Sequence, residues 1–281
     1  MNYLIYNPLS KSNHGEEVKE KALKDLESDF DSLLVLDGTQ INLDEFHTKL
    51  DPADKLIIIG GDGTLNVFAN VIKKYNVKND LYLYEGGSGN DFLNDIGRQG
   101  KLTKLNKYFD SLPIVEVNGD KRYFVNNVSF GIDGEVCVEA DRLRQLHKKN
   151  ISYTKIAVGL LLGKYKKPKA RVIVDGVERK YNDVWLASAL NGQFIGGGMM
   201  AAPGQDRLSG YLSNVVFHYK SRLLSAINFP AIFKGTHIKK KRMCEMIKGK
   251  RIEVFFDRPT GLQVDGEVYK NVLHYVAYYE D

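Results

Sequence analysis

The chain has 281 residues, of which 43% are hydrophobic and 27% charged, as in a globular protein with room for two domains. Its formal net charge of +5 suits an anionic partner without requiring one. No run of eighteen apolar residues is present, and the first residues lack the layout of a signal peptide. Cys137 and Cys244 form no metal-site or disulfide pattern. We therefore expect a cytoplasmic protein without a transmembrane helix.

Residues 1–117 alternate short apolar strands with helical patterns. Leu65, Phe68, Ala69 and Ile72, for example, recur at the spacing of one buried helix face. Such alternation implies right-handed crossovers and a mostly parallel sheet. The expected strands are 3–6, 33–36, 56–59 and 81–84, and the expected helices are 15–28, 42–50 and one that begins at residue 64.

The pattern then changes to antiparallel β structure, which predicts a second domain over residues 118–271. Asn118-Gly119 and Asp175-Gly176 are typical of tight turns between paired strands. The final strand, about 272–281, is left open to return to the first domain. The expected strands are 113–117, 122–130, 171–174, 184–190, 212–219, 251–256 and 273–279, with helical patterns near 138–162 and 221–234.

Three polar loops follow strands of the first domain, at residues 7–11, 60–66 and 86–91. Ligands of parallel sheets bind outside the carboxyl ends of the strands, so we expect these loops to meet. Gly60, Gly61 and Gly63 would let the main chain approach a ligand, and the start of a helix favours phosphate. Asp62 would repel phosphate unless a metal ion lies between them. The alternative is a tight strand–helix turn without a ligand, since neither a Rossmann nor a Walker motif is matched.

The sequence of these loops resembles that of one enzyme family. Residues 60–66, Gly-Gly-Asp-Gly-Thr-Leu-Asn, are similar to a signature shared by diacylglycerol kinases, sphingosine-type lipid kinases and NAD kinases. Residues 87–92, Gly-Ser-Gly-Asn-Asp-Phe, resemble the second signature of the diacylglycerol kinase catalytic family in particular. Further segments resemble landmarks of that family in the same order, at residues 7–10, 124–133, 196–203 and 264–267.

The resemblance implies a three-layer α/β domain followed by an antiparallel β-sandwich domain, with ATP held between them. The implied reaction is transfer of the γ-phosphoryl group of ATP to a lipid hydroxyl with Mg²⁺, and the favoured conversion is diacylglycerol to phosphatidic acid. A kinase for another lipid alcohol, such as a sphingoid base or ceramide, is the close alternative. A non-catalytic regulatory protein that binds nucleotide or lipid is the alternative from another class.

The same resemblance assigns residues to ATP and Mg²⁺. Asp62 would hold the catalytic Mg²⁺, because a carboxylate beside polyphosphate needs a cation. Asp37 is the weakest nucleotide contact and would reach the sugar or the base. The full set of expected nucleotide contacts is Asn7, Ser10, Asp37, Gly60, Gly61, Asp62, Gly63, Thr64, Asn66, Ser88, Asn90 and Asp91.

Asp265 and Glu267 resemble the family's Asp-Gly-Glu segment, which implies that one of them, or the pair with Asp62, is the catalytic base. Their spacing of two would place both carboxylates on one side of an extended chain. A plain β-turn is the alternative, since Asp-Gly is a common turn pair. The sequence does not choose between the two carboxylates.

The chain departs from the family pattern at several positions. Val67 stands where an acidic or polar residue is usual, and Glu85 where proline is usual. Some members hold a structural Mg²⁺ near Asp206, and here Ser209 replaces the aspartate. Asp206 and the carbonyl of Tyr211 could still supply oxygens, but a hydroxyl is a poor substitute for a carboxylate on Mg²⁺, so we expect this site to be weakened or lost.

Basic stretches lie at residues 142–149, 164–171 and 239–251, near Ile232, Phe233 and Met243. Lysines among apolar residues are typical of transient peripheral contact with a membrane that supplies the lipid substrate. The alternative is a set of solvated faces. No nucleic acid partner is expected, because no such binding motif is found, and a homodimer is left open.

Overall fold

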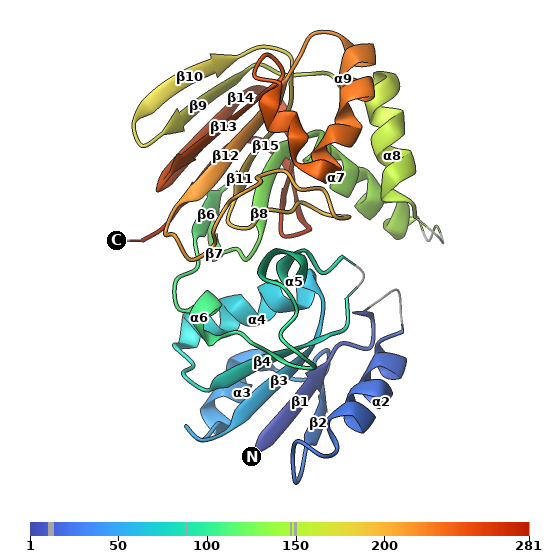
Figure 1. Ribbon diagram of the computed structural model, residues 1–281, viewed down its shortest axis with the longest axis vertical. Helices are drawn as coiled ribbons and strands as arrows, with labels where there is room; N and C mark the ends of the chain where they lie inside the picture. Colours follow the sequence, from blue (N-terminus) through green and yellow to red (C-terminus); the bar gives the residue numbers. More distant parts are fainter. Residues whose placement is uncertain (11–13, 88, 147, 149–150, 281) are drawn as a thin grey trace. The chain divides into compact units, whose positions relative to one another are not determined.

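A computed structural model describes residues 1–10, 14–87, 89–146, 148 and 151–280 (Figure 1). The chain divides into two units, Met1–Leu112 and Pro113–Asp281.

The sheet of the first unit is parallel except at one edge. Its strands follow the order β2-β1-β3-β4-β5, and β5 is antiparallel to β4. In register, Tyr6 pairs with Asp37 and Ile59, and Gly60 pairs with Glu85, so the carboxyl ends of four strands lie level at one edge. The strands are β1 (Asn2–Tyr6), β2 (Leu34–Asp37), β3 (Lys55–Gly60), β4 (Asp80–Glu85) and β5 (Thr103–Lys104).

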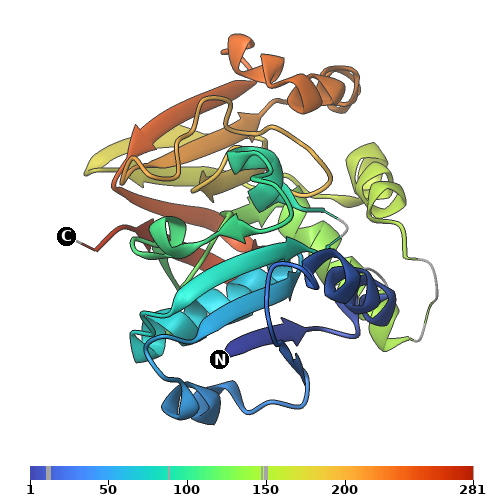
Figure 2. The same ribbon diagram turned by 60° about the horizontal axis from the view of Figure 1, so that its bottom comes forward.

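Helices cover both faces of this sheet, which confirms the three-layer α/β prediction (Figures 1 and 2). On one face, α2 (Gly15–Leu26) packs its apolar side against β1 and β3. On the other, α4 (Asp62–Tyr75) buries Leu65, Phe68, Ala69 and Ile72, the predicted face. The predicted helix 42–50 is divided into two short pieces. The remaining helices are α3 (Leu43–Phe46), η1 (His47–Lys49), α5 (Asp91–Ile96) and α6 (Asn106–Phe109).

The second unit is built on an antiparallel sheet, as predicted. Most of its strands follow the order β13-β12-β11-β8-β14-β15-β6-β7, and β9 pairs with β10 and β14. The strands are β6 (Ile114–Val117), β7 (Asp120–Tyr123), β8 (Asn127–Gly131), β9 (Ala170–Val174), β10 (Val177–Tyr181), β11 (Val184–Leu190), β12 (Leu212–His218), β13 (Cys244–Gly249), β14 (Arg251–Val264) and β15 (Glu267–Tyr278).

The structure places the final strand, which the sequence left open, and it differs from the sequence prediction at residues 113–117 and 122–130. β15 pairs with β14 and β6, so the final strand belongs to this sheet and residues 113–117 lie in the second unit. The predicted strand 122–130 is interrupted between β7 and β8. The reason is that the N–H groups of Val125, Asn126 and Asn127 bind a side chain, Asp265, instead of a neighbouring strand.

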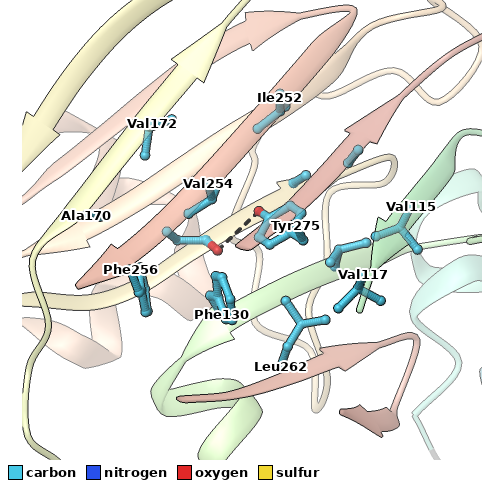
Figure 3. Packing of buried hydrophobic residues seen from close by; sticks show 14 of the residues in the cluster. Val115, Val117, Phe130, Ala170, Val172, Ile252, Val254, Phe256, Leu262 and Tyr275 are labelled. Atoms are coloured by element: carbon cyan, nitrogen blue, oxygen red, sulfur yellow. Dashed lines mark hydrogen bonds between the residues drawn. The ribbon is translucent and has the colours of Figure 1, made fainter. Parts of the chain in front are cut away.

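The strands enclose one apolar core, drawn in Figure 3. Phe130 stacks on Phe256 with ring centroids 4.5 Å apart. Tyr275 is fully buried, and its hydroxyl donates a hydrogen bond to the carbonyl oxygen of Ala187 across 3.3 Å. Residues of β8, β9, β11, β14 and β15 meet in this core, which confirms a β-sandwich domain.

A second cluster packs helices against the outer side of β11 and β12, around Trp185, Val215 and Phe217. The predicted helix 138–162 is shifted, since α7 begins at Ile132 and a separate helix follows it. Among the described residues, no helix has the length and apolarity to cross a bilayer. The helices are α7 (Ile132–Gln145), α8 (Tyr153–Gly159), η2 (Leu160–Lys164), α9 (Arg222–Asn228), η3 (Phe229–Lys234) and η4 (Thr236–Lys239).

Candidate active site

Two glycine loops of the first unit touch each other through their backbones. A Cβ atom on Gly61 would lie 2.7 Å from the Cα atom of Gly87, which is closer than side chains tolerate. The N–H of Gly86 donates to the carbonyl oxygen of Gly60 across 3.0 Å. Gly61 and Gly87 are therefore required by the contact between the loops, a role that the sequence did not indicate.

Asp62 fastens the second loop to the first. Its carboxylate accepts the N–H groups of Asp91 and Phe92 at 3.0 and 2.9 Å. These are the first residues of α5, so Asp62 supplies both hydrogen bonds and a negative charge at that helix N-terminus. Sequence reasoning missed this role. Each carboxylate oxygen has a second lone pair, so the same side chain can also face a cation.

Gly63 is the glycine of the first loop that the surrounding protein does not explain. A Cβ atom there would meet no described atom within 4 Å, and the residue is exposed. It lies in the first turn of α4, where N–H groups have no partner within the helix. Thr64 follows directly, with its hydroxyl 2.6 Å from the position of a Cβ on Gly60. Open space, helix N–H groups and a hydroxyl suit a phosphate group.

Gly63→Ala is expected to weaken ATP binding by tenfold or more while leaving the fold intact. The new Cβ would occupy the space assigned to phosphate, whereas alanine in a helix is more stable than glycine by up to about 1 kcal/mol. Calorimetric titration with ATP and thermal unfolding would measure the two effects. Gly159→Ala, at a helical glycine with equally open surroundings, is the matched control. Unchanged ATP affinity in Gly63→Ala would contradict this placement of phosphate.

Asn90 and Glu85 hold the second loop in place. Asn90 adopts a left-handed conformation with φ 52°, and its Nδ2 donates to Glu85 Oε1 at 2.7 Å and to the carbonyl of Gly87 at 3.1 Å. Glu85 also binds Arg98 through two hydrogen bonds of 2.7 and 2.9 Å, which raise the pKa of the guanidinium. Glu85, which stands where proline is usual in the family pattern, thus has a structural role in holding the second loop. The predicted contact Ser88 lies outside the described residues.

The remaining predicted contacts follow β1 and β2 along the same sheet edge. Asn7 Oδ1 accepts the N–H of Leu9 at 2.9 Å, and the Ser10 hydroxyl is buried without a hydrogen-bond partner among the described residues. Asp37 accepts two hydrogen bonds from Thr39 and lines a cavity of about 360 Å³ beside α3. Asn66, by contrast, is buried within the packed face of α4.

In the second unit, Asp265 lies in the turn between β14 and β15. Asp265 and Gly266 have φ values of 47° and 91°, as in a type I′ hairpin turn. Asp265 Oδ1 accepts the N–H groups of Asn126 and Asn127 at 2.8 and 2.9 Å, and Oδ2 accepts that of Val125 at 2.5 Å. Asp265 thus lies in a hairpin turn, and its carboxylate anchors the start of β8, while its catalytic role stays a prediction.

Glu267 has different surroundings. It forms an ion pair with Arg122, and its side chain is 49% exposed. The chain is turned and not extended at Asp265-Gly266, so the spacing of two does not place both carboxylates on one side by itself. Arg207, which the sequence analysis missed, is buried and donates to the carbonyl of Val125 and to Asn126 Oδ1, each at 3.2 Å. No sequence motif marks this arginine.

Comparison with known proteins agrees with this architecture. The family model for the diacylglycerol kinase catalytic domain matches residues 2–113, and that for the YegS C-terminal NAD kinase beta sandwich-like domain matches residues 126–276. The chain belongs to the diacylglycerol kinase family. The two matches together span most of the chain.

Three similar proteins share low sequence identity with this chain. A diacylglycerol kinase of Mycobacterium tuberculosis is 28% identical over 194 residues, which are 66% of this chain and 62% of that protein. A protein of Staphylococcus epidermidis, provisionally named as a lipid kinase, is 25% identical over 231 residues, 76% of this chain and 70% of its own. A Bacillus anthracis structure, provisionally assigned as a diacylglycerol kinase, has the same fold, with a TM-score of 0.71 at 18% identity over 100% of this chain and 94% of that one.

The structural Mg²⁺ that the resemblance suggested near Asp206, Ser209 and Tyr211 does not fit the residues here. The carbonyl oxygens that would bind it already accept hydrogen bonds: Gln205 Nε2 donates to the carbonyls of Tyr211 at 2.6 Å and Asp206 at 3.2 Å. The Ser209 hydroxyl donates to the Asp206 carbonyl at 2.6 Å, and Asp206 Oδ1 accepts the N–H of Leu208 at 2.9 Å. The Gln205 amide and the Ser209 hydroxyl thus donate to the carbonyl oxygens that a cation would need as ligands.

EDTA is accordingly expected to leave the unfolding temperature of the nucleotide-free protein unchanged. Gln205→Ala, in contrast, should lower the free energy of unfolding by about 3 kcal/mol, because it removes the 2.6 Å donor to the partly buried carbonyl oxygen of Tyr211 and the acceptor of the buried Ser213 hydroxyl. Gln205 is only 4% exposed, and its Oε1 also accepts the hydroxyl of Ser213 at 2.6 Å. Thermal and urea unfolding measure both effects. Destabilisation by EDTA, reversed by Mg²⁺, would contradict this interpretation.

The catalytic Mg²⁺ is expected at a different place, beside Asp62 in the first unit. The described residues contain no cluster of three or more histidine, cysteine, aspartate or glutamate side chains that could hold a metal ion. Asp62 fits such an ion only as one ligand, through the lone pairs that do not face α5. Most ligands of this Mg²⁺ would therefore come from the nucleotide phosphates and water.

Proposed function

We propose that this protein transfers the γ-phosphoryl group of ATP to the hydroxyl group of a lipid, with diacylglycerol as the favoured acceptor. The observation that carries the proposal is the open first turn of α4. Gly63 and Thr64 offer N–H groups and a hydroxyl beside Asp62, while the other loop glycines are explained by packing. The family membership supports the choice of a kinase.

Phosphoryl transfer needs positioning, charge neutralisation and a group that takes the alcohol proton. In this proposal the N–H groups at the start of α4 bind phosphate, and Asp37 and the cavity beside α3 bind the sugar or the base. Mg²⁺, when bound with ATP, would neutralise phosphate charge. Asp265 and Glu267 of the second unit are the candidate groups for the alcohol proton.

Two other functions are proposed as alternatives to the phosphorylation of diacylglycerol. A sphingoid base, ceramide or another lipid alcohol would use the same phosphate site. A regulatory protein that binds nucleotide without turnover is favoured by one observation, namely that the carboxylate of Asp265 already accepts three backbone hydrogen bonds.

Transfer of labelled phosphate from ATP to a panel of lipid alcohols in mixed micelles tests the proposal. We expect diacylglycerol to be labelled in the presence of Mg²⁺. Labelling of another alcohol alone would change the substrate but not the reaction. ATP binding without labelling of any lipid would replace the kinase by the regulatory protein.

A further inference from the structure

The outward side of α9 and η3 is apolar, which is unusual for a surface helix. Leu223 and Ile227 are 71% and 64% exposed, and Leu224 and Phe233 are also exposed, while the residue that α9 buries is Ser225. A surface helix normally buries its apolar side and exposes polar residues. No charged residue occurs between Leu223 and Phe233.

A neighbouring segment extends this apolar surface. Arg222 ties α9 to η2, because its guanidinium donates to the carbonyl oxygens of Tyr165 at 2.6 Å and Leu161 at 3.3 Å. Leu162 of η2 is 72% exposed, and Val158 of α8 is exposed as well. Contiguous exposed apolar residues of this kind mark an interaction site. We call Val158, Leu162, Leu223, Leu224, Ile227 and Phe233 the apolar platform.

The chain around the apolar platform is strongly basic. Residues 142–174 and 207–244 include the platform and contain no aspartate or glutamate. Exposed cations in these segments include Lys155, Lys166, Lys234, Lys239 and Lys241. Apolar side chains among lysines match a bilayer surface, where hydrocarbon lies beneath anionic headgroups.

We propose that the apolar platform docks on the surface of a bilayer that contains anionic phospholipids. The proposal deepens the proposed lipid kinase function and rests on it for its purpose, namely access to a lipid substrate. A second copy of the chain is a poorer occupant, because two such basic surfaces repel each other. The proposal also corrects the residues expected from the sequence: Phe233 is exposed, but Ile232 and Met243 are buried.

Cosedimentation of the full chain with vesicles tests the proposal without using enzyme activity. We expect binding to phosphatidylcholine vesicles that contain phosphatidylglycerol, weaker binding to phosphatidylcholine alone, and a decrease with added salt. The double variant Leu223→Ser/Ile227→Ser should lower the partition coefficient about tenfold or more, since it removes apolar surface. Lys239→Gln/Lys241→Gln should lower it about 25-fold, a factor of about five for each charge.

Val177→Ser is the matched control, since Val177 is 56% exposed on β10 of the same unit, outside the platform, and its loss should leave binding unchanged. Equal vesicle binding by the wild type and both double variants would overturn the proposal. Self-association that Leu223→Ser/Ile227→Ser abolishes, measured by sedimentation velocity without vesicles, would instead assign the platform to a second copy.

Activity assays keep this proposal distinct from the proposed function. The platform variants should still phosphorylate a short-chain diacylglycerol dispersed in water and lose activity on vesicles. Equal loss on both substrates would overturn the docking role. If no lipid is phosphorylated by the wild type, the kinase function fails, while the vesicle binding result stands on its own.

Discussion

Asp62→Asn is expected to abolish phosphoryl transfer and to lower the free energy of unfolding by about 2 kcal/mol. The carboxylate accepts the N–H groups of Asp91 and Phe92 and so joins the two glycine loops. An asparagine side chain offers one acceptor oxygen and turns an N–H₂ group toward one of these donors, which leaves a hydrogen bond unmade. The charge that would face Mg²⁺ is lost as well.

Arg98→Ala separates these two effects. This variant loosens the second loop by releasing Glu85, but it leaves the Asp62 carboxylate in place. The Arg98–Glu85 pair is half-exposed, so its loss should cost less than about 1 kcal/mol and retain most of the turnover. Both proteins would be assayed at saturating ATP and at a temperature where urea unfolding shows each to be folded. Full turnover in Asp62→Asn would remove Asp62 from the chemistry and leave it a purely structural role.

The sequence predicted the architecture well because the relevant patterns are local. The spacing of Leu65, Phe68 and Ile72 identified the buried face of α4, and apolar runs identified β1, β3 and β4. The errors arose where a side chain from a distant position decides the backbone structure. Asp265 draws the N–H groups of residues 125–127 out of the ladder, so one predicted strand is interrupted. The sequence around residues 125–127 does not indicate this contact with Asp265.

The candidate site was likewise predicted where the local sequence is sufficient and missed where distant parts of the chain meet. The sequence indicated which loops carry polar residues, and the level strand ends place the described ones at one sheet edge. It did not show which glycine serves packing and which faces open space, because that depends on the contact between Gly61 and Gly87. Gln205 and Arg207 were missed for a similar reason, since their roles come from carbonyl groups that only the fold brings near.

Two variants, Asp265→Asn and Glu267→Gln, are expected to show which carboxylate holds the backbone and which takes the alcohol proton. Asparagine tolerates the positive φ of residue 265, so the turn should persist while a donor replaces one carboxylate oxygen. The variant should lose about 3 kcal/mol of stability, because one of three backbone donors then faces an N–H₂ group. Glu267→Gln breaks one half-exposed ion pair with Arg122 and should change stability by less than about 1 kcal/mol.

Turnover then distinguishes the two carboxylates. Protonation of Asp265 would weaken three backbone hydrogen bonds, whereas Glu267 would give up one ion pair of a half-exposed side chain. We therefore expect Glu267→Gln to lower kcat about 100-fold, a typical effect of losing a general base, at unchanged ATP affinity. Glu178→Gln, at another half-exposed glutamate paired with an arginine, is the control and should be fully active. Normal kcat in Glu267→Gln, with a large loss in folded Asp265→Asn, would assign the base to Asp265 and show that the three hydrogen bonds position it for the substrate.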